Sequence, residues 1–180
     1  MMKLLVSIFF IISLNNVMCD DKFPGFTEVG VGKIEIYYKT RGSVTDFNVV
    51  APHDTSSILS ETNSWIAVGF GPAKSMDKSS AVVCKSTSNG KTIQHYYNNR
   101  TTPSLIDQAN PTIGLTNTKL TFDSQFIICS FTRENSNSNP RYYNINNNPY
   151  VLAAWGTNRF TGPNSGKKIT YLKLFDNYMI

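Results

Sequence analysis

The fold is decided by the stretch Trp65-Ile-Ala-Val-Gly-Phe70, followed by Ser79-Ser-Ala-Val-Val-Cys-Lys85, Asn89-Gly90 and the segment from Lys91 to Asn98. The first segment is apolar on both faces, which is typical of a central strand in a closed stack of sheets. Asn-Gly between two alternating segments is a strong signal for a β-hairpin. We therefore expect residues 79–85 and 91–98 to pair as a hairpin beside a buried central strand.

The same alternation of apolar and polar residues extends outward from this stretch. It predicts further strands over residues 33–39, 44–51, 119–123, 125–133, 150–155 and 169–175. Residues 99–118 have no clear period and are expected to form a long connection, and residues 134–149 form a polar, asparagine-rich loop. About nine short strands without a helical block predict an all-β fold, a two-sheet antiparallel β-sandwich of immunoglobulin-like architecture, with one domain over residues 22–180.

The N-terminus has the layout of a secretory signal peptide, which we assign to residues 1–19. Lys3 precedes an apolar run from Leu4 to Leu14, and Val17-Met18-Cys19 supplies a cleavage site. A run of about eleven residues is short for a transmembrane helix, although an uncleaved N-terminal anchor is the alternative interpretation. No second apolar stretch approaches spanning length, so the sequence predicts a secreted, extracellular protein.

Removal of the signal peptide leaves two cysteines, Cys84 and Cys129. Cys84 shares a strand face with Val82, and Cys129 shares one with Ile127, so both side chains are expected to point inward. In an oxidising compartment such a pair predicts one disulfide, with two unpaired buried thiols as the alternative. Asn99-Arg100-Thr101 is a sequon for N-glycosylation and predicts a surface segment there.

Composition and motifs narrow the class of function. The formal net charge is +5, but the basic residues are scattered, so we expect no nucleic-acid partner. The sequence lacks the glycine-flanked serine of hydrolases, a paired zinc-binding histidine motif and a dinucleotide-binding loop. The only histidines are His53, at a turn, and His95, which is expected to be a strand residue with a satisfied ring nitrogen. These features predict a non-catalytic protein without a metal site.

Four segments, in this order and at these separations, resemble the sequence pattern of DOMON domains. They are Trp65-Ile-Ala-Val-Gly-Phe-Gly71 with the loop that contains Met76, then Ser79-Ser-Ala-Val-Val83, Ser130-Phe-Thr-Arg133 and Leu152-Ala-Ala-Trp-Gly156. The resemblance covers residues 33–175. It implies a β-sandwich related to the N-terminal domain of dopamine β-monooxygenase, in a family whose secreted and membrane-attached members bind haem b or, by proposal, sugars.

The resemblance also implies where haem ligands would lie. In haem-binding members a methionine and a histidine hold the iron, and Met76 occupies the place of the methionine. The histidine follows a tyrosine in the last strand, where this sequence reads Thr170-Tyr171-Leu172-Lys173. Leu172 has no lone pair and cannot coordinate iron. Met76 is therefore a candidate for one axial ligand only, and the alternative is a loop methionine that fills a gap at the edge of the sandwich.

The leading hypothesis from the sequence is a secreted, non-catalytic module that binds a small ligand, a glycan or an extracellular protein. One alternative is a small extracellular haem-b electron-transfer domain that uses Met76. A further alternative is a carbohydrate-binding domain in which Tyr142, Tyr143 and Tyr150 form an aromatic platform beside the asparagine-rich loop. These tyrosines can equally be strand-end residues with solvated hydroxyls.

Overall fold

A computed structural model describes residues 25–29, 34–52, 64–99, 102–122, 126–157 and 170–173. The predicted signal peptide and His53 lie outside these residues. The strands are β1 (Gly25–Val29), β2 (Ile34–Arg41), β3 (Val44–Pro52), β4 (Ser64–Gly71), β5 (Ser79–Thr87), β6 (Gly90–Asn99), β7 (Thr102–Leu105), β8 (Leu115–Phe122), β9 (Phe126–Glu134), β10 (Tyr150–Thr157) and β11 (Thr170–Lys173). One 3-10 turn, η2 (Ile145–Asn147), lies in the loop before β10.

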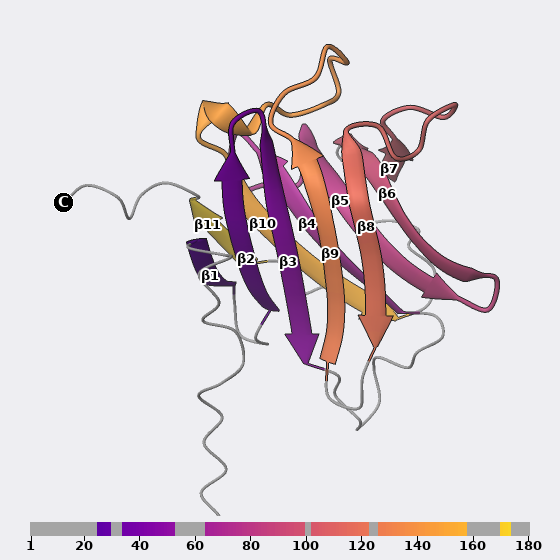
Figure 1. Cartoon of the computed structure of the whole chain (residues 1–180). Coiled ribbons are helices and arrows are strands. Elements are labelled where there is room, and N and C mark those ends of the chain that lie inside the picture. The colour runs from indigo at the N-terminus through magenta and orange to yellow at the C-terminus, as the bar shows by residue number, and fades with distance from the viewer. Residues whose placement is uncertain are drawn as a thin grey trace, which may run out of the picture.

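The strands form two facing antiparallel sheets (Figure 1). The five-stranded sheet has the order β1-β2-β3-β9-β8, and the six-stranded sheet has the order β11-β10-β4-β5-β6-β7. The predicted all-β sandwich is therefore confirmed. Among the described residues, no helix is long and apolar enough to cross a lipid bilayer.

The structure has eleven strands where the sequence predicts about nine. The two additional strands are β1 and β7, which have five and four residues and are too short to show a period. β7 contains Pro103, which has no backbone N–H to donate. An edge strand tolerates proline because no further strand on its outer side requires that hydrogen bond. β8 also begins earlier than predicted, because a bulge between Thr116 and Lys119 interrupts the alternation that the sequence pattern relies on.

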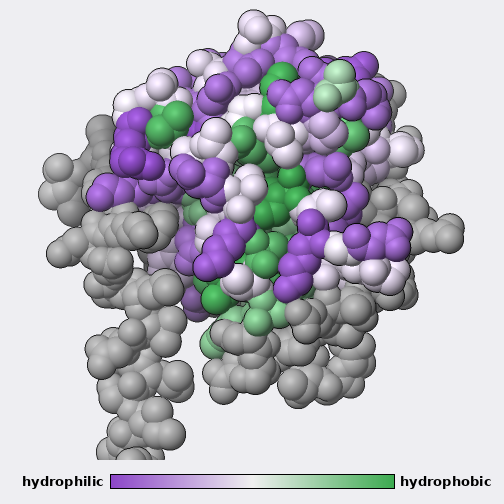
Figure 2. Space-filling model, turned by 45° about the vertical axis from the view of Figure 1, so that its right-hand side comes forward, coloured by the Kyte–Doolittle hydropathy of each residue, from purple (hydrophilic) through white to green (hydrophobic). Residues whose placement is uncertain are grey.

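The core lies between the sheets and follows the alternation of the strands. Inward-facing side chains such as Ile36, Phe47, Phe70 and Val82 are almost fully buried. On the side of the sandwich where β8 faces β6, core residues retain a little exposure at the rim, and Figure 2, which brings this side forward, shows apolar surface between hydrophilic side chains.

A disulfide between Cys84 and Cys129 joins the two sheets through this core, with 6.4 Å between the Cα atoms. Cys84 comes from β5 of the six-stranded sheet and Cys129 from β9 of the five-stranded sheet. The predicted pairing is confirmed. In the chain-entropy picture, closing a loop of this length stabilises the fold by about 4 kcal/mol.

The predicted hairpin is also confirmed. β5 and β6 pair from Ser79 and Asn98 down to Thr87 and Gly90, and residues 88 and 89 form the turn. Gly90 has a φ of 118°, a backbone conformation that glycine adopts without the steric cost of a Cβ atom.

Candidate functional site

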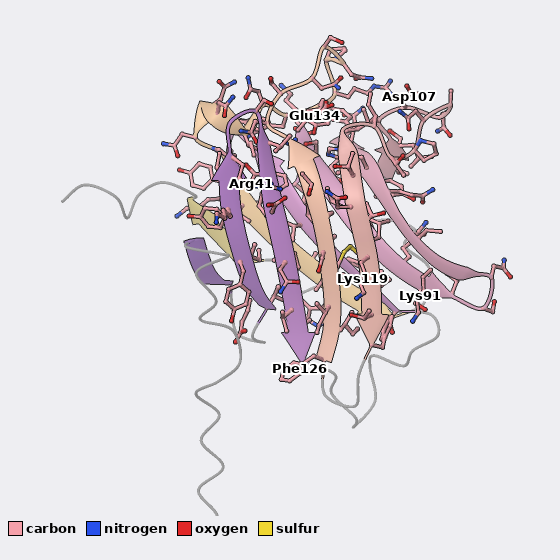
Figure 3. All side chains as sticks on the ribbon, viewed as in Figure 1. Arg41, Lys91, Asp107, Lys119, Phe126 and Glu134 are labelled. Carbon is pink, nitrogen blue, oxygen red and sulfur yellow. A yellow bond between two sulfur atoms is a disulfide. The ribbon has the colours of Figure 1, made fainter. Side chains whose placement is uncertain are left out.

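Three connections meet at one end of the sandwich, which we call the loop end: the β2–β3 turn, the β4–β5 loop (residues 72–78) and the β9–β10 loop (residues 135–149). Figure 1 shows the β9–β10 loop, in orange, beside the β2–β3 turn. In Figure 3, Arg41 and Glu134 are labelled on this side, whereas Phe126 lies at the opposite end of its strand. A loop of this length within a compact domain is uncommon unless it serves a function.

The β9–β10 loop is fixed at its start by Asn135, which is 2% exposed. Its backbone N–H donates to Ser43 O at 2.8 Å, and its side-chain amide donates to Gly42 O at 3.0 Å. Thr45 Oγ1 donates to Asn135 Oδ1 at 2.7 Å, and Ile145 N donates to Asn135 O at 2.9 Å. One asparagine thus joins the β2–β3 turn to both ends of the loop.

The middle of the loop rests on Arg133, an inward-facing residue of β9 that is 0% exposed. Nη2 donates to Tyr143 O at 2.6 Å and to Ser80 Oγ at 3.2 Å, and Nη1 donates to Glu134 O at 2.8 Å. Ser80 Oγ also accepts a bond of 3.2 Å from Tyr143 N. The backbone of Tyr143 is therefore held through both its N–H and its C=O.

Arg133 is a charge without a carboxylate partner among the side chains that the structure describes. Its guanidinium carbon lies 4.8 Å from the centre of the Phe70 ring and 4.2 Å from that of Tyr142. Burial lowers the pKa of Arg133 to about 10, which leaves the side chain charged at neutral pH. Carbonyl oxygens and aromatic faces stabilise this charge in place of an ion pair.

His95, on β6, lies in the same buried cluster and is also 0% exposed. Nδ1 lies 3.1 Å from Ile113 O, which fixes the tautomer with the proton on Nδ1, and the ring meets Tyr142 edge-on at 4.7 Å. Burial, followed by the charge of Arg133, lowers the pKa of His95 to about 3. The lowered pKa keeps the imidazole neutral at neutral pH, and Nε2 has no hydrogen-bond partner among the described residues.

Tyr142 is 5% exposed and belongs to this cluster rather than to an exposed aromatic platform. Its hydroxyl donates to Glu134 O at 2.7 Å, and burial raises its pKa to about 12. Gly114 makes room for the ring, because a Cβ at that residue would come 2.5 Å from the Tyr142 hydroxyl oxygen. Tyr143 and Tyr150 are half-buried, and burial raises the pKa of Tyr143. The structure thus does not bring three exposed tyrosine rings together.

Met76 is half-buried in the β4–β5 loop, and its carbonyl accepts a 2.7 Å bond from Ser79 Oγ. The backbone of Leu172 pairs with Val151 at the edge of the six-stranded sheet. Methionine–histidine ligation of haem needs an imidazole opposite the methionine, but His95 is held in the core by contacts with Ile113 and Tyr142. The described residues therefore do not fit a methionine–histidine haem site.

The described residues also contain no group of three or more metal-ligating side chains. Asn99 is exposed at the end of β6, which agrees with the surface position expected of the sequon. It lies at the loop end, because its neighbour Asn98 donates an amide hydrogen bond of 2.9 Å to Ser79 Oγ.

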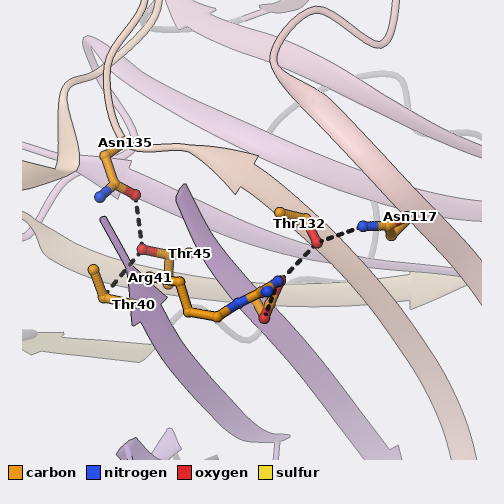
Figure 4. A network of polar contacts seen from close by, with 7 residues as sticks. Thr40, Arg41, Thr45, Asn117, Thr132 and Asn135 are labelled. Atoms are coloured by element: carbon orange, nitrogen blue, oxygen red, sulfur yellow. Dashed lines mark hydrogen bonds and ion pairs between the residues drawn. The ribbon is translucent and has the colours of Figure 1, made fainter. Parts of the chain in front are cut away.

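A polar ladder crosses four strands on the outer face of the five-stranded sheet, next to the loop end (Figure 4). Asn117 Nδ2 donates to Thr132 Oγ1 at 3.2 Å, and Thr132 donates to Asp46 Oδ1 at 2.7 Å. Arg41 Nη2 contacts both carboxylate oxygens of Asp46 at 2.7 Å. Asn117 has a φ of 52° at the bulge of β8, where asparagine is better tolerated than most residues.

Sequence reasoning did not identify Arg133, Asn135 and Ser80 as a functional group of residues. The sequence does place Arg133 on the inward face of its strand, because it lies two residues after Phe131 and four after Cys129, which both point into the core. A charged residue in an otherwise apolar series indicates a buried polar anchor, whereas the partners of that anchor cannot be read from spacing alone.

The sequence and the structure were compared with those of known proteins. The family model of the DOMON domain matches residues 32–156. Among solved structures, the cytochrome domain of Myriococcum thermophilum cellobiose dehydrogenase is similar, with a TM-score of 0.45 and 10% identity over 86% of this chain and 78% of that chain. No curated protein matches the chain. The family match covers more than half of the chain and includes β2 to β9 and nearly all of β10, and we conclude that the chain belongs to the DOMON domain family.

Proposed function

We propose that this protein is a non-catalytic extracellular binding module that recognises its partner with the loop end of the sandwich. The observation that carries the proposal is the order of the β9–β10 loop. A polar surface loop of this length has no need of a buried arginine, a buried asparagine and a buried tyrosine beneath it if it only connects two strands. Such support reduces the entropy lost when a loop binds a partner.

The composition of the loop favours recognition. Its exposed residues are Ser136, Ser138, Pro140, Arg141 and the run from Asn146 to Asn148. Serine and asparagine supply adaptable hydrogen bonds, and arginine is common where proteins bind proteins, so this set resembles the composition of antibody binding loops. The loop therefore offers hydrogen-bonding groups on a rigid base.

The chemistry of the interior favours binding over catalysis. Within the part of the chain that the structure describes, the histidine and the buried arginine, His95 and Arg133, are both 0% exposed and form their contacts inside the core. A general acid or base must come within hydrogen-bonding reach of its substrate. The inter-sheet disulfide and the predicted signal peptide support action outside the cell.

The test compares the wild-type protein with two triple variants on a glycan array and an array of secreted proteins. The loop variant Arg141→Ala, Asn146→Ala, Asn147→Ala removes exposed side chains of the β9–β10 loop. The control variant Ser88→Ala, Lys91→Ala, Thr92→Ala removes exposed side chains of the β5–β6 hairpin, at the opposite end of the sandwich. We expect a specific interaction of the wild type to be lost in the loop variant and retained in the control variant.

Two results would contradict the proposal. One is an interaction that survives in the loop variant and disappears in the hairpin variant, which would place recognition elsewhere. The other is turnover of a substrate by the purified protein. A haem titration of the same protein addresses the electron-transfer alternative, because a low-spin Soret band that disappears in Met76→Ala would replace this proposal with that one.

A further inference from the structure

We propose that Asn89 is a site of spontaneous covalent modification, where the side-chain amide is converted to aspartate and isoaspartate by attack of the Gly90 backbone nitrogen. Asn89-Gly90 is the sole Asn-Gly pair in the sequence. It lies at the exposed tip of the β5–β6 hairpin. Attack within one chain needs no external reagent other than water, and proximity makes such reactions fast relative to their intermolecular counterparts.

The local geometry leaves the side chain of Asn89 exposed and unhindered. Asn89 is exposed, and its side-chain amide makes no hydrogen bond to the described residues; only its backbone N–H does, to Thr87 Oγ1 at 3.2 Å. Gly90 has no side chain that could obstruct the attack, and apart from its chain neighbours no atom lies within 4 Å of the point where a Cβ would be. Rotation about ψ and χ1 of Asn89 brings the Gly90 nitrogen to the amide carbon.

The steps balance without a further reactant. The Gly90 nitrogen forms a bond to Cγ of Asn89, the Cγ–Nδ2 bond breaks, and ammonia leaves with the proton from the Gly90 nitrogen. Water then opens the resulting cyclic imide. Cleavage at Cγ gives aspartate, and cleavage at the main-chain carbonyl gives isoaspartate, in which the backbone runs through the side chain and is longer by one methylene.

The modification has a local structural consequence. Thr87 and Gly90 pair across a turn of only two residues. An added methylene in that turn is incompatible with this register, so isoaspartate should open the tip of the hairpin. Further along the hairpin, Cys84 pairs with Ile93 and is bound to Cys129, which limits the opening to the tip.

The experiment is incubation of the folded protein at mildly alkaline pH and body temperature, followed by peptide mapping with mass spectrometry and an isoaspartate assay. We expect the mass shift of amide-to-acid conversion to accumulate in the Asn89 peptide faster than at Asn146 or Asn147, which are exposed but not followed by glycine. Asn89→Gln should abolish the shift, because its longer side chain forms the ring poorly. Gly90→Ala should slow it.

Two outcomes would overturn the proposal. One is conversion at Asn89 that is no faster than at Asn146 and Asn147. The other is conversion that occurs only in urea-unfolded protein, which would mean that the folded hairpin protects the site. Hydrogen exchange adds a second measurement, since the modified protein should show faster exchange at the hairpin tip and unchanged exchange at Ile93.

Discussion

Two arginines of this domain lie in opposite surroundings. Arg133 is 0% exposed and is held by two carbonyl oxygens, one hydroxyl and two aromatic rings. The side chain of Arg41 is 55% exposed and forms an ion pair with Asp46, whose side chain is 21% exposed. Surface ion pairs add little to stability because water already solvates both charges, whereas a buried polar group is costly to leave without partners. The buried arginine should therefore matter more, although it has no counter-ion.

The largest effect is expected for Arg133→Met. The change leaves Tyr143 O, Glu134 O and Ser80 Oγ without this donor, and we expect a loss of about 4 kcal/mol in the free energy of unfolding. Urea unfolding measures the loss. Arg133→Lys is the matched control, because lysine keeps the charge but cannot reach all three acceptors. Its free energy of unfolding should lie between those of Arg133→Met and the wild type. A methionine variant as stable as the wild type would show that the charge is dispensable.

The next effect is a loss of stability in acid that depends on His95. Its pKa is about 3 in the folded state against 6.5 for an unperturbed histidine, so only the unfolded chain binds the proton between these values. Stability should therefore fall as the pH drops from 6.5 towards 3, by roughly 3 kcal/mol at pH 4 relative to pH 7. Urea unfolding of the wild type and of His95→Gln at both pH values isolates the part of this loss that His95 causes. The carboxylates are the same in the two proteins, so their contribution cancels in the comparison. An equal fall in the two proteins would contradict it.

A smaller effect tests the packing of Tyr142. Gly114 has a φ of 69° and lies against the Tyr142 ring, whereas Gly42 has a φ of 61° with nothing within 4 Å of its missing Cβ. Alanine at either residue carries the cost of the left-handed conformation, but only Gly114→Ala displaces a ring. We expect Gly114→Ala to destabilise the fold by about 2 kcal/mol more than Gly42→Ala. Similar thermal midpoints for the two variants would mean that the ring moves aside at little cost.

The smallest effect is expected for Arg41→Gln, which removes the charge of the polar ladder but leaves Thr132 bound to Asp46. The pKa of Arg41 is raised by its hydrogen bond to Asp46, yet the guanidinium is solvated. We expect a thermal midpoint close to that of the wild type, and any difference should shrink further at high salt. A loss comparable to that of Arg133→Met would overturn the contrast between the two arginines.

The difference between the two arginines also shows what could be predicted from the sequence. The alternation of apolar and polar residues correctly predicted that Cys84 and Cys129 point inward and form a disulfide. The face of a strand on which a side chain lies depends only on its neighbours along the chain. Alternation did not predict the start of β8 at residues 115–118. There the bulge shifts the pairing with β9, and the spacing of apolar residues does not reveal such a shift. The asparagine-rich loop was identified as a loop, but its anchors Arg133 and Asn135 act through residues far away in sequence, such as Ser80 and Gly42.

The tyrosines illustrate the same limit. Tyr142 and Tyr143 are adjacent in the sequence and were expected to serve the same surface. In the structure the Tyr142 ring is buried against His95. The Tyr143 ring is half-buried against the core, and its backbone is bound by Arg133 and Ser80. The Tyr142 ring lies against Gly114, where a Cβ would collide with it, and a contact between residues so far apart in the sequence cannot be read from the local pattern.

The bulge in β8 has a consequence for how copies of this domain meet. β8 is an edge strand of the five-stranded sheet, and a straight edge offers a row of N–H and C=O groups to a strand from another molecule. The left-handed turn at Asn117 breaks that row, and the exposed Lys119 adds a charge that an incoming strand would have to desolvate. The domain thus carries at this edge its own barrier against polymerisation through β-sheets.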